Sequence, residues 1–137
     1  MQQVQTYLEL AQLGAARTAL DQANVQVQAV GDPQLEAIFN RVTTLVLLEY
    51  DDPAGAFAAI SQSVHALGKL GNRHDLAQSL VVQAQVLLAT RQDKAAATLL
   101  QEAIRLFGQT GAVADEQRAR GLLVRATISQ PLEEFQR

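Results

Sequence analysis

Histidines and paired carboxylates are the first side chains in this sequence that could support metal binding or acid–base catalysis. Neither of the two histidines, His65 and His74, has a carboxylate at a metal-ligand spacing such as H-E-x-x-H. The pair Asp51–Asp52 precedes a proline and fits a turn with a helix cap, whereas Glu133–Glu134 fits a solvated tail. These residues therefore predict surface or structural roles.

Serine, cysteine and glycine-rich motifs also give no catalytic signal. Ser61, Ser63 and Ser79 lack the Gly-x-Ser-x-Gly context of an activated nucleophile, and the chain has no cysteine. The segment GKL at residues 68–70 lacks the remaining residues of a phosphate-binding loop and has no strand before it. We therefore expect neither an enzyme nor a bound metal or cofactor.

The elements that would position any functional residue are indicated by an internal repeat. Gly31, Gly71 and Gly111 are spaced 40 residues apart, and each is followed by a polar stretch that leads into an apolar helical pattern. The same shift superposes small and apolar residues, namely Ala16, Ala56 and Ala96; Leu20, Ile60 and Leu100; and Ala23, Ser63 and Ala103.

The spacing inside each copy is helical. Ala96, Leu100, Ala103 and Phe107 stand at i, i+4, i+7 and i+11, which is one face of an α-helix. Asp-Pro pairs mark helix starts, and the repeated glycines fit left-handed C-terminal caps. The pattern predicts seven helices, near residues 2–13, 15–30, 33–50, 53–70, 73–90, 93–109 and 114–129.

The small-residue pattern resembles that of the tetratricopeptide repeat family. Leu80, Ala84 and Leu87 on one helix, followed by Ala96, Leu100 and Ala103 on the next, match the family's series of large and small positions. Other copies match less fully: Asn40 departs at the large position. The 40-residue period exceeds the usual 34 and is similar to a subclass found in bacterial transcription activators of the maltose-regulator type and related signalling proteins. HEAT and armadillo arrays share the longer period but lack the small-residue pattern.

The resemblance implies an all-α, right-handed solenoid of antiparallel helix hairpins. Its repeat domain would span residues 1–130, with units near 1–30, 31–70 and 71–110, a partial unit at 111–130, and a tail at 131–137. The incomplete ends fit either a fragment of a larger protein or a final capping helix.

The family's concave groove, lined by the first helix of each hairpin, is the expected binding surface. Its apolar and glutamine-rich positions suit an extended peptide or an amphipathic helix. The matching residues are Gln5, Leu8, Glu9, Ile38, Arg41, Leu45, Glu49, Gln78, Val81, Gln85, Leu88, Arg120, Leu123 and Thr127.

Charge and hydropathy limit the partners. A formal net charge of −3 and the lack of a basic stripe argue against direct nucleic-acid contact, and no apolar run is long enough to span a membrane.

We expect a cytoplasmic protein–protein or peptide interaction module within a larger bacterial regulator. The alternative is a domain that senses a ligand or peptide and controls an attached effector. Apolar residues on the terminal helices also predict a homodimer. They are Val4, Tyr7, Leu8 and Leu10 near the N-terminus and Leu122, Leu123, Val124 and Ile128 near the C-terminus.

Overall fold

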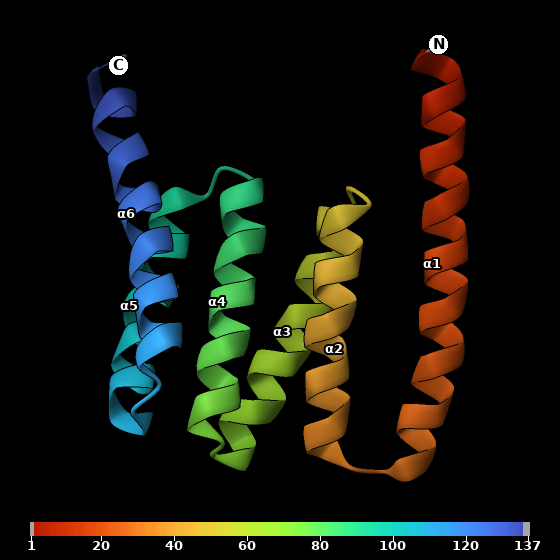
Figure 1. Ribbon diagram of the computed structural model, residues 1–137, viewed down its shortest axis with the longest axis horizontal. Coiled ribbons are helices and arrows are strands. Elements are labelled where there is room, and N and C mark those ends of the chain that lie inside the picture. The colour runs from red at the N-terminus through yellow and green to blue at the C-terminus, as the bar shows by residue number, and fades with distance from the viewer. Residues whose placement is uncertain (1, 136–137) are drawn as a thin grey trace.

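The computed structural model describes the backbone of residues 2–135 and the side chains of residues 9–128. All regular structure in this part of the chain is α-helical (Figure 1). The helices are α1 (Gln2–Val30), α2 (Pro33–Glu49), α3 (Pro53–Leu70), α4 (Arg73–Ala89), α5 (Asp93–Thr110) and α6 (Val113–Phe135). The prediction of an all-α fold is therefore confirmed.

The predicted starts of α2, α3 and α4 are confirmed by side-chain caps. The Asp32 carboxylate accepts a hydrogen bond from the Gln34 amide, and the Asp52 carboxylate accepts one from Gly55. The Asn72 side chain caps α4 in the same way. Each cap satisfies an amide that has no partner within its helix, so these polar residues fix where α2, α3 and α4 begin.

The predicted glycine caps are confirmed as well. Gly31, Gly71 and Gly111 all have φ between 71° and 73°, in the left-handed region that residues with a Cβ atom disfavour. The turn between α2 and α3 and the turn between α4 and α5 also contain a residue with positive φ. These residues are Asp51 and Arg91.

The expected break between helices at residues 2–13 and 15–30 is wrong, because α1 is a single helix of 29 residues. Where the second copy has the turn Asp51-Asp52-Pro53, the first copy has Ala11-Gln12-Leu13 at the corresponding positions. These are good helix formers and include no proline or capping residue. Gly14 alone costs a helix only about 1 kcal/mol, so the helix continues through it.

The C-terminal boundary also differs from the prediction. We expect a helix that ends near residue 129 and a tail from Pro131, whereas α6 runs on to Phe135. A proline in a helix interior removes one hydrogen bond and its ring crowds the preceding turn, so it often kinks or ends a helix, but here the helical backbone continues past it. Glu133 and Glu134, which follow it, have favourable helix propensity.

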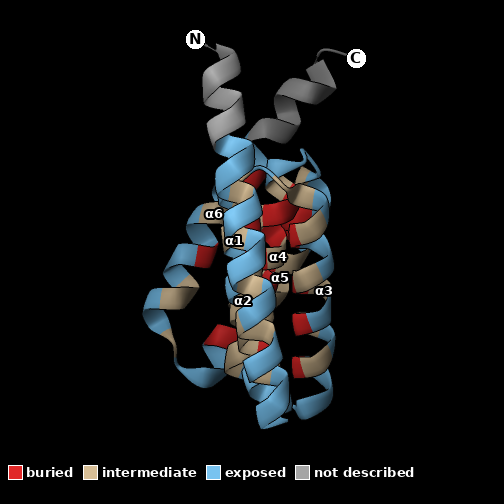
Figure 2. Cartoon of the chain, turned by 90° about the vertical axis from the view of Figure 1, so that its right-hand side faces the viewer, coloured by how far each residue is buried: buried red, intermediate tan, exposed pale blue. Residues whose placement is uncertain are grey.

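Consecutive helices pack against each other in two layers. Helices α2, α4 and α6 form one layer, and α3 and α5 lie behind them (Figure 1). Helix α1 contacts α2 at one end of the row. Buried residues lie on the faces that the layers turn toward each other, while the outer faces are exposed (Figure 2).

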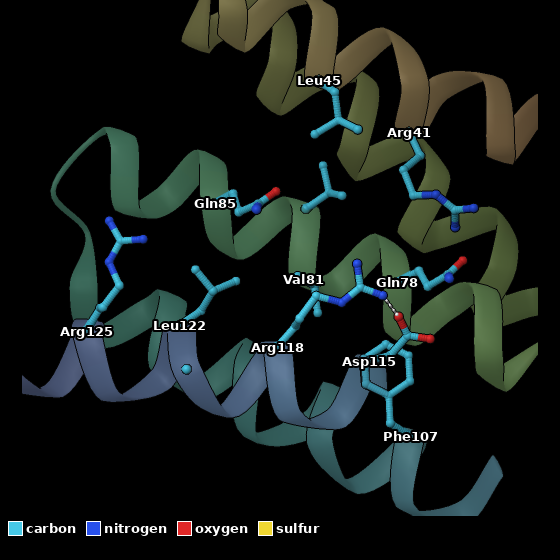
Figure 3. Close-up of a pocket in the computed structure, with 12 residues that line it drawn as sticks. Arg41, Leu45, Gln78, Val81, Gln85, Phe107, Asp115, Arg118, Leu122 and Arg125 are labelled. Atoms are coloured by element: carbon cyan, nitrogen blue, oxygen red, sulfur yellow. Dashed lines mark hydrogen bonds and ion pairs between the residues drawn. The ribbon is translucent and has the colours of Figure 1, made fainter. Parts of the chain in front are cut away.

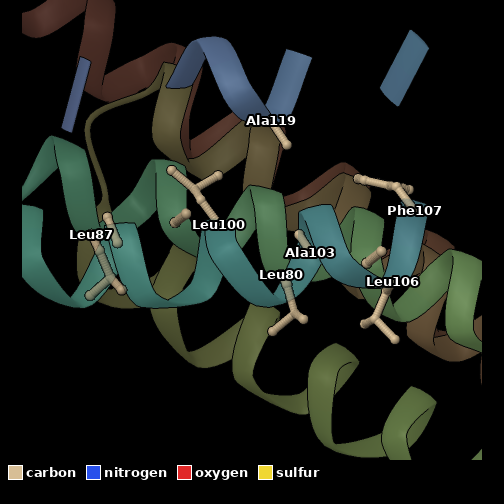
Figure 4. Packing of buried hydrophobic residues seen from close by; sticks show 10 residues of the cluster. Leu80, Leu87, Leu100, Ala103, Leu106, Phe107 and Ala119 are labelled. Atoms are coloured by element: carbon tan, nitrogen blue, oxygen red, sulfur yellow. The ribbon is translucent and has the colours of Figure 1, made fainter. Parts of the chain in front are cut away.

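The main core lies where α4, α5 and α6 meet. Leu80, Leu100 and Phe107 pack around the small residues Ala103 and Ala119 (Figure 4). A second cluster centred on Ile60 joins α2, α3 and α4. Fully buried alanines allow the helices to approach closely, since a larger side chain at such a position would overpack the core.

Candidate partner-binding groove

A cavity of about 700 Å³ opens between the three helices of the front layer (Figure 3). Residues from α2, α4 and α6 form most of its wall, and Phe107 of α5 reaches it from behind. Its lining consists of Arg41, Leu45, Gln78, Val81, Val82, Gln85, Phe107, Asp115, Arg118, Gly121, Leu122 and Arg125. We call this cavity the α2–α4–α6 groove.

The groove follows the 40-residue repeat. Arg118, Leu122 and Arg125 of α6 stand 40 positions after Gln78, Val82 and Gln85 of α4. The same shift relates Arg41 and Leu45 of α2 to Val81 and Gln85. Residues at equivalent positions of the three repeat units therefore line the same groove, because the first helix of each unit has the same orientation.

An apolar belt crosses the groove between polar residues. Leu45, Val81 and Leu122 contribute one apolar side chain from each helix (Figure 3). On α4 the belt is flanked by Gln78 and Gln85, and on α6 it is flanked by arginines at the same helical spacing. An apolar centre with a polar rim is the usual composition of a protein-binding surface.

Arg41 is held in place by a buried chain of hydrogen bonds. Its Nη1 donates to the Asp75 carbonyl oxygen at 3.2 Å and to Ser79 Oγ at 3.4 Å. Ser63 Oγ donates to the Ala37 carbonyl oxygen at 2.7 Å and lies 2.9 Å from Ser79 Oγ. Because the one Ser63 proton is used on Ala37, Ser79 is the donor between the serines. The chain joins α2, α3 and α4.

The α6 side of the groove carries an exposed ion pair. Arg118 Nη2 lies 2.5 Å from Asp115 Oδ1, and the arginine side chain is 76% exposed. His74 Nε2 is 3.9 Å from Asp115 Oδ2, and its ring meets Phe107 edge-on with centroids 5.9 Å apart. Exposed pairs of this kind contribute only about 0–1 kcal/mol, so Arg118 can exchange its partner at low cost.

Arg125, seven residues after Arg118 on α6, is the third arginine of the groove. Its side chain is exposed, and within the part of the chain whose side chains are described no carboxylate lies within ion-pair distance of it. The groove therefore has a fixed arginine on α2, an exchangeable arginine on α6 and a third arginine that is open to solvent.

Five of the residues predicted for the binding surface line this groove, namely Arg41, Leu45, Gln78, Val81 and Gln85. Of the other predicted residues whose side chains the structure describes, none lines it. Glu9 is exposed on α1, Glu49 is exposed near the end of α2, and Ile38 and Leu88 are half-buried, with Leu88 packed against the main core. The side chains of Gln5 and Leu8 lie outside the described residues.

The α6 residues predicted for the binding surface lie outside this groove. Arg120 pairs with Glu116, and Thr127 Oγ1 donates to the Leu123 carbonyl oxygen. Leu123 packs against the main core, as Leu122 of the groove lining also does. The three predicted residues match Gln78, Val81 and Gln85 of α4 at a shift of 42 residues, which also superposes Ala119 on Ala77. The unshifted 40-residue register gives Arg118, Leu122 and Arg125 directly, and that signal was present in the sequence.

Two of the serines and one of the histidines considered from the sequence make contacts within the fold. Ser63 and Ser79 are buried and bonded to each other, and His74 lies beside Phe107 and Asp115. No group of three or more histidine, aspartate and glutamate side chains there could hold a metal ion. None of the described helices is long and apolar enough to cross a membrane.

Comparison of the chain with models of protein families, with curated proteins and with solved structures finds no match.

Proposed function

We propose that this chain is a protein-interaction module that binds a segment of a partner protein in the α2–α4–α6 groove. The observation that carries the proposal is the meeting of three repeat-equivalent helix faces around one cavity with an apolar belt and a polar rim. Gln78 and Gln85 stand beside the belt, where their amide groups can bond the backbone of a bound peptide.

The resemblance to tetratricopeptide repeats supports the same proposal and extends it. In that view the chain is a right-handed solenoid of helix hairpins, and it serves as the partner-binding part of a larger cytoplasmic bacterial regulator. The 40-residue spacing of Gly31, Gly71 and Gly111 and the buried alanines are the features that support this extension.

A second candidate function is the sensing of a small ligand. The groove volume of about 700 Å³ favours it, because small-molecule sites commonly occupy about 300–1,000 Å³. Such a ligand would use the same belt and rim.

Selection of a random peptide library on the purified chain tests the proposal. Enriched peptides should bind in fluorescence anisotropy, and Leu45→Glu or Val81→Glu should weaken that binding at least roughly tenfold while circular dichroism stays helical. Gln62→Glu on the exposed side of α3 is the matched control and should bind normally. Undiminished binding by a folded Leu45→Glu variant excludes the groove, and failure of all peptides favours the small-ligand alternative.

A further inference from the structure

The α2–α4–α6 groove is locally basic on a chain that is acidic overall. The formal net charge of the chain is −3, whereas the groove lining contains three arginines and a single aspartate. Complementary charge across an interface speeds association and selects partners by sign. The groove therefore favours a partner segment that carries negative charge.

The arginines differ in how freely they can meet such a partner. Arg41 is 15% exposed, with Nη2 3.5 Å from the Asp75 carboxylate and Nη1 bonded to Ser79, so its charge is already compensated. Arg118 holds its Asp115 partner in an exposed pair, and Arg125 has no acidic partner among the residues whose side chains are described. The available positive charge thus lies on α6.

The spacing of these two arginines defines a recognition pattern. Arg118 and Arg125 are seven residues apart on α6, which is about 10 Å along the helix axis, and Leu122 lies between them. In a helical partner segment, residues seven positions apart lie on one face and span the same distance, with positions i+3 and i+4 between them. A segment with two acidic residues at that spacing could reach both guanidinium groups while its apolar side chains rest on the belt.

We infer that the natural partner presents an acidic amphipathic segment. Its apolar side chains contact Leu45, Val81 and Leu122, and its carboxylates pair with Arg118 and Arg125. This inference rests on the proposed function, because it assigns the partner's chemistry for the same groove. Carboxylate side chains supply the charge, so binding does not require the free C-terminus of the partner.

The test uses peptides that share one apolar pattern, taken from a groove-dependent peptide of the library selection. The polar positions are filled with glutamate, glutamine or lysine. At low salt the glutamate peptide should bind roughly tenfold more tightly than the lysine peptide, with glutamine between them. The difference should shrink with added salt, because exposed charges are screened within about 10 Å at 0.1 M ionic strength.

Charge reversal in the protein supplies the control. Arg118→Glu/Arg125→Glu should reverse the preference in favour of lysine, and Arg118→Gln/Arg125→Gln should abolish it. Arg73→Glu/Lys94→Glu makes the same change in net charge at exposed positions outside the groove and should preserve it.

Two results overturn the inference in distinguishable ways. Equal binding of the three peptides, with Leu45 and Val81 still required, rejects the acidic partner but leaves the groove as a peptide site. Binding that no longer depends on Leu45 or Val81 rejects the proposed function and the inference together.

Discussion

Adjacent threonines on α2 differ in their hydrogen bonding. Thr44 Oγ1 is buried and lies 2.8 Å from the Asn40 carbonyl oxygen and 3.3 Å from that of Ala56. Thr43 Oγ1 is also buried, but it has no hydrogen-bond partner in the described part of the chain. A buried polar atom without a partner reduces stability, whereas a satisfied one contributes modestly.

We expect opposite effects when each hydroxyl is removed. Thr43→Val should leave the free energy of unfolding unchanged or raise it by up to about 1 kcal/mol, and Thr44→Val should lower it by about 1 kcal/mol. Urea unfolding followed by circular dichroism measures both. If Thr43→Val is as destabilising as Thr44→Val, the Thr43 hydroxyl has a partner.

Single residues in the groove show which features sequence reasoning can reach. The resemblance to tetratricopeptide repeats predicted Leu45, Val81 and Gln85 for one surface, and all three line the groove. The resemblance could not show that Arg41 is bound to Ser79, since their contact joins residues 38 positions apart. Whether an arginine is open to a ligand depends on such long-range contacts.

At the scale of the elements, substitutions can distinguish a glycine in a left-handed helix cap from a glycine inside a helix. Gly71 has φ of +71° and ends α3, whereas Gly68 lies within the same helix. A Cβ atom added at either position meets no other atom within 4 Å. Any difference between substitutions at the two sites therefore comes from the backbone.

Gly71→Ala should lower the free energy of unfolding by about 1–2 kcal/mol, because a left-handed conformation is unfavourable for alanine. Gly68→Ala should raise it by about 0.5–1 kcal/mol, because alanine is the better helix former. Thermal or urea unfolding of the two variants gives the comparison. A stabilising Gly71→Ala would mean that this residue does not end α3 in the left-handed region.

Helix boundaries were predictable wherever local chemistry determines them. Asp32, Asp52 and Asn72 cap their helices as expected, since a cap depends on a few neighbouring residues. The continuous α1 was missed because the repeat was extended to a copy that lacks the turn residues. In this segment the residue types at Ala11 and Gln12, which do not favour a turn, indicate the continuous helix, whereas the 40-residue period indicates a break.

At the scale of the whole molecule, apolar side chains are exposed at both ends of the helix row. Leu10 on α1 and Val124 and Ile128 on α6 are each more than half exposed. The side chains of Val4, Tyr7 and Leu8, which belong to the same prediction, lie outside the described residues. Surfaces of this kind favour pairing of identical copies.

We predict that the isolated chain dimerises at high concentration, and that Val124→Glu/Ile128→Glu returns it to a monomer. Leu70→Glu, at an exposed position on α3, is the control and should leave the dimer intact. Light scattering over a concentration series reports the mass. A constant mass near 14.8 kDa at every concentration contradicts the dimer.

The central claim is that the three helices of the front layer form one binding surface. Methyl-labelled NMR of the chain with a library-selected peptide tests it most directly, because contacts from the peptide to leucine and valine methyl groups locate the bound segment. We predict contacts to Leu45, Val81 and Leu122 together, one from each helix of the groove. Contacts confined to α3 and α5, with these three methyl-bearing residues unperturbed, would contradict the claim.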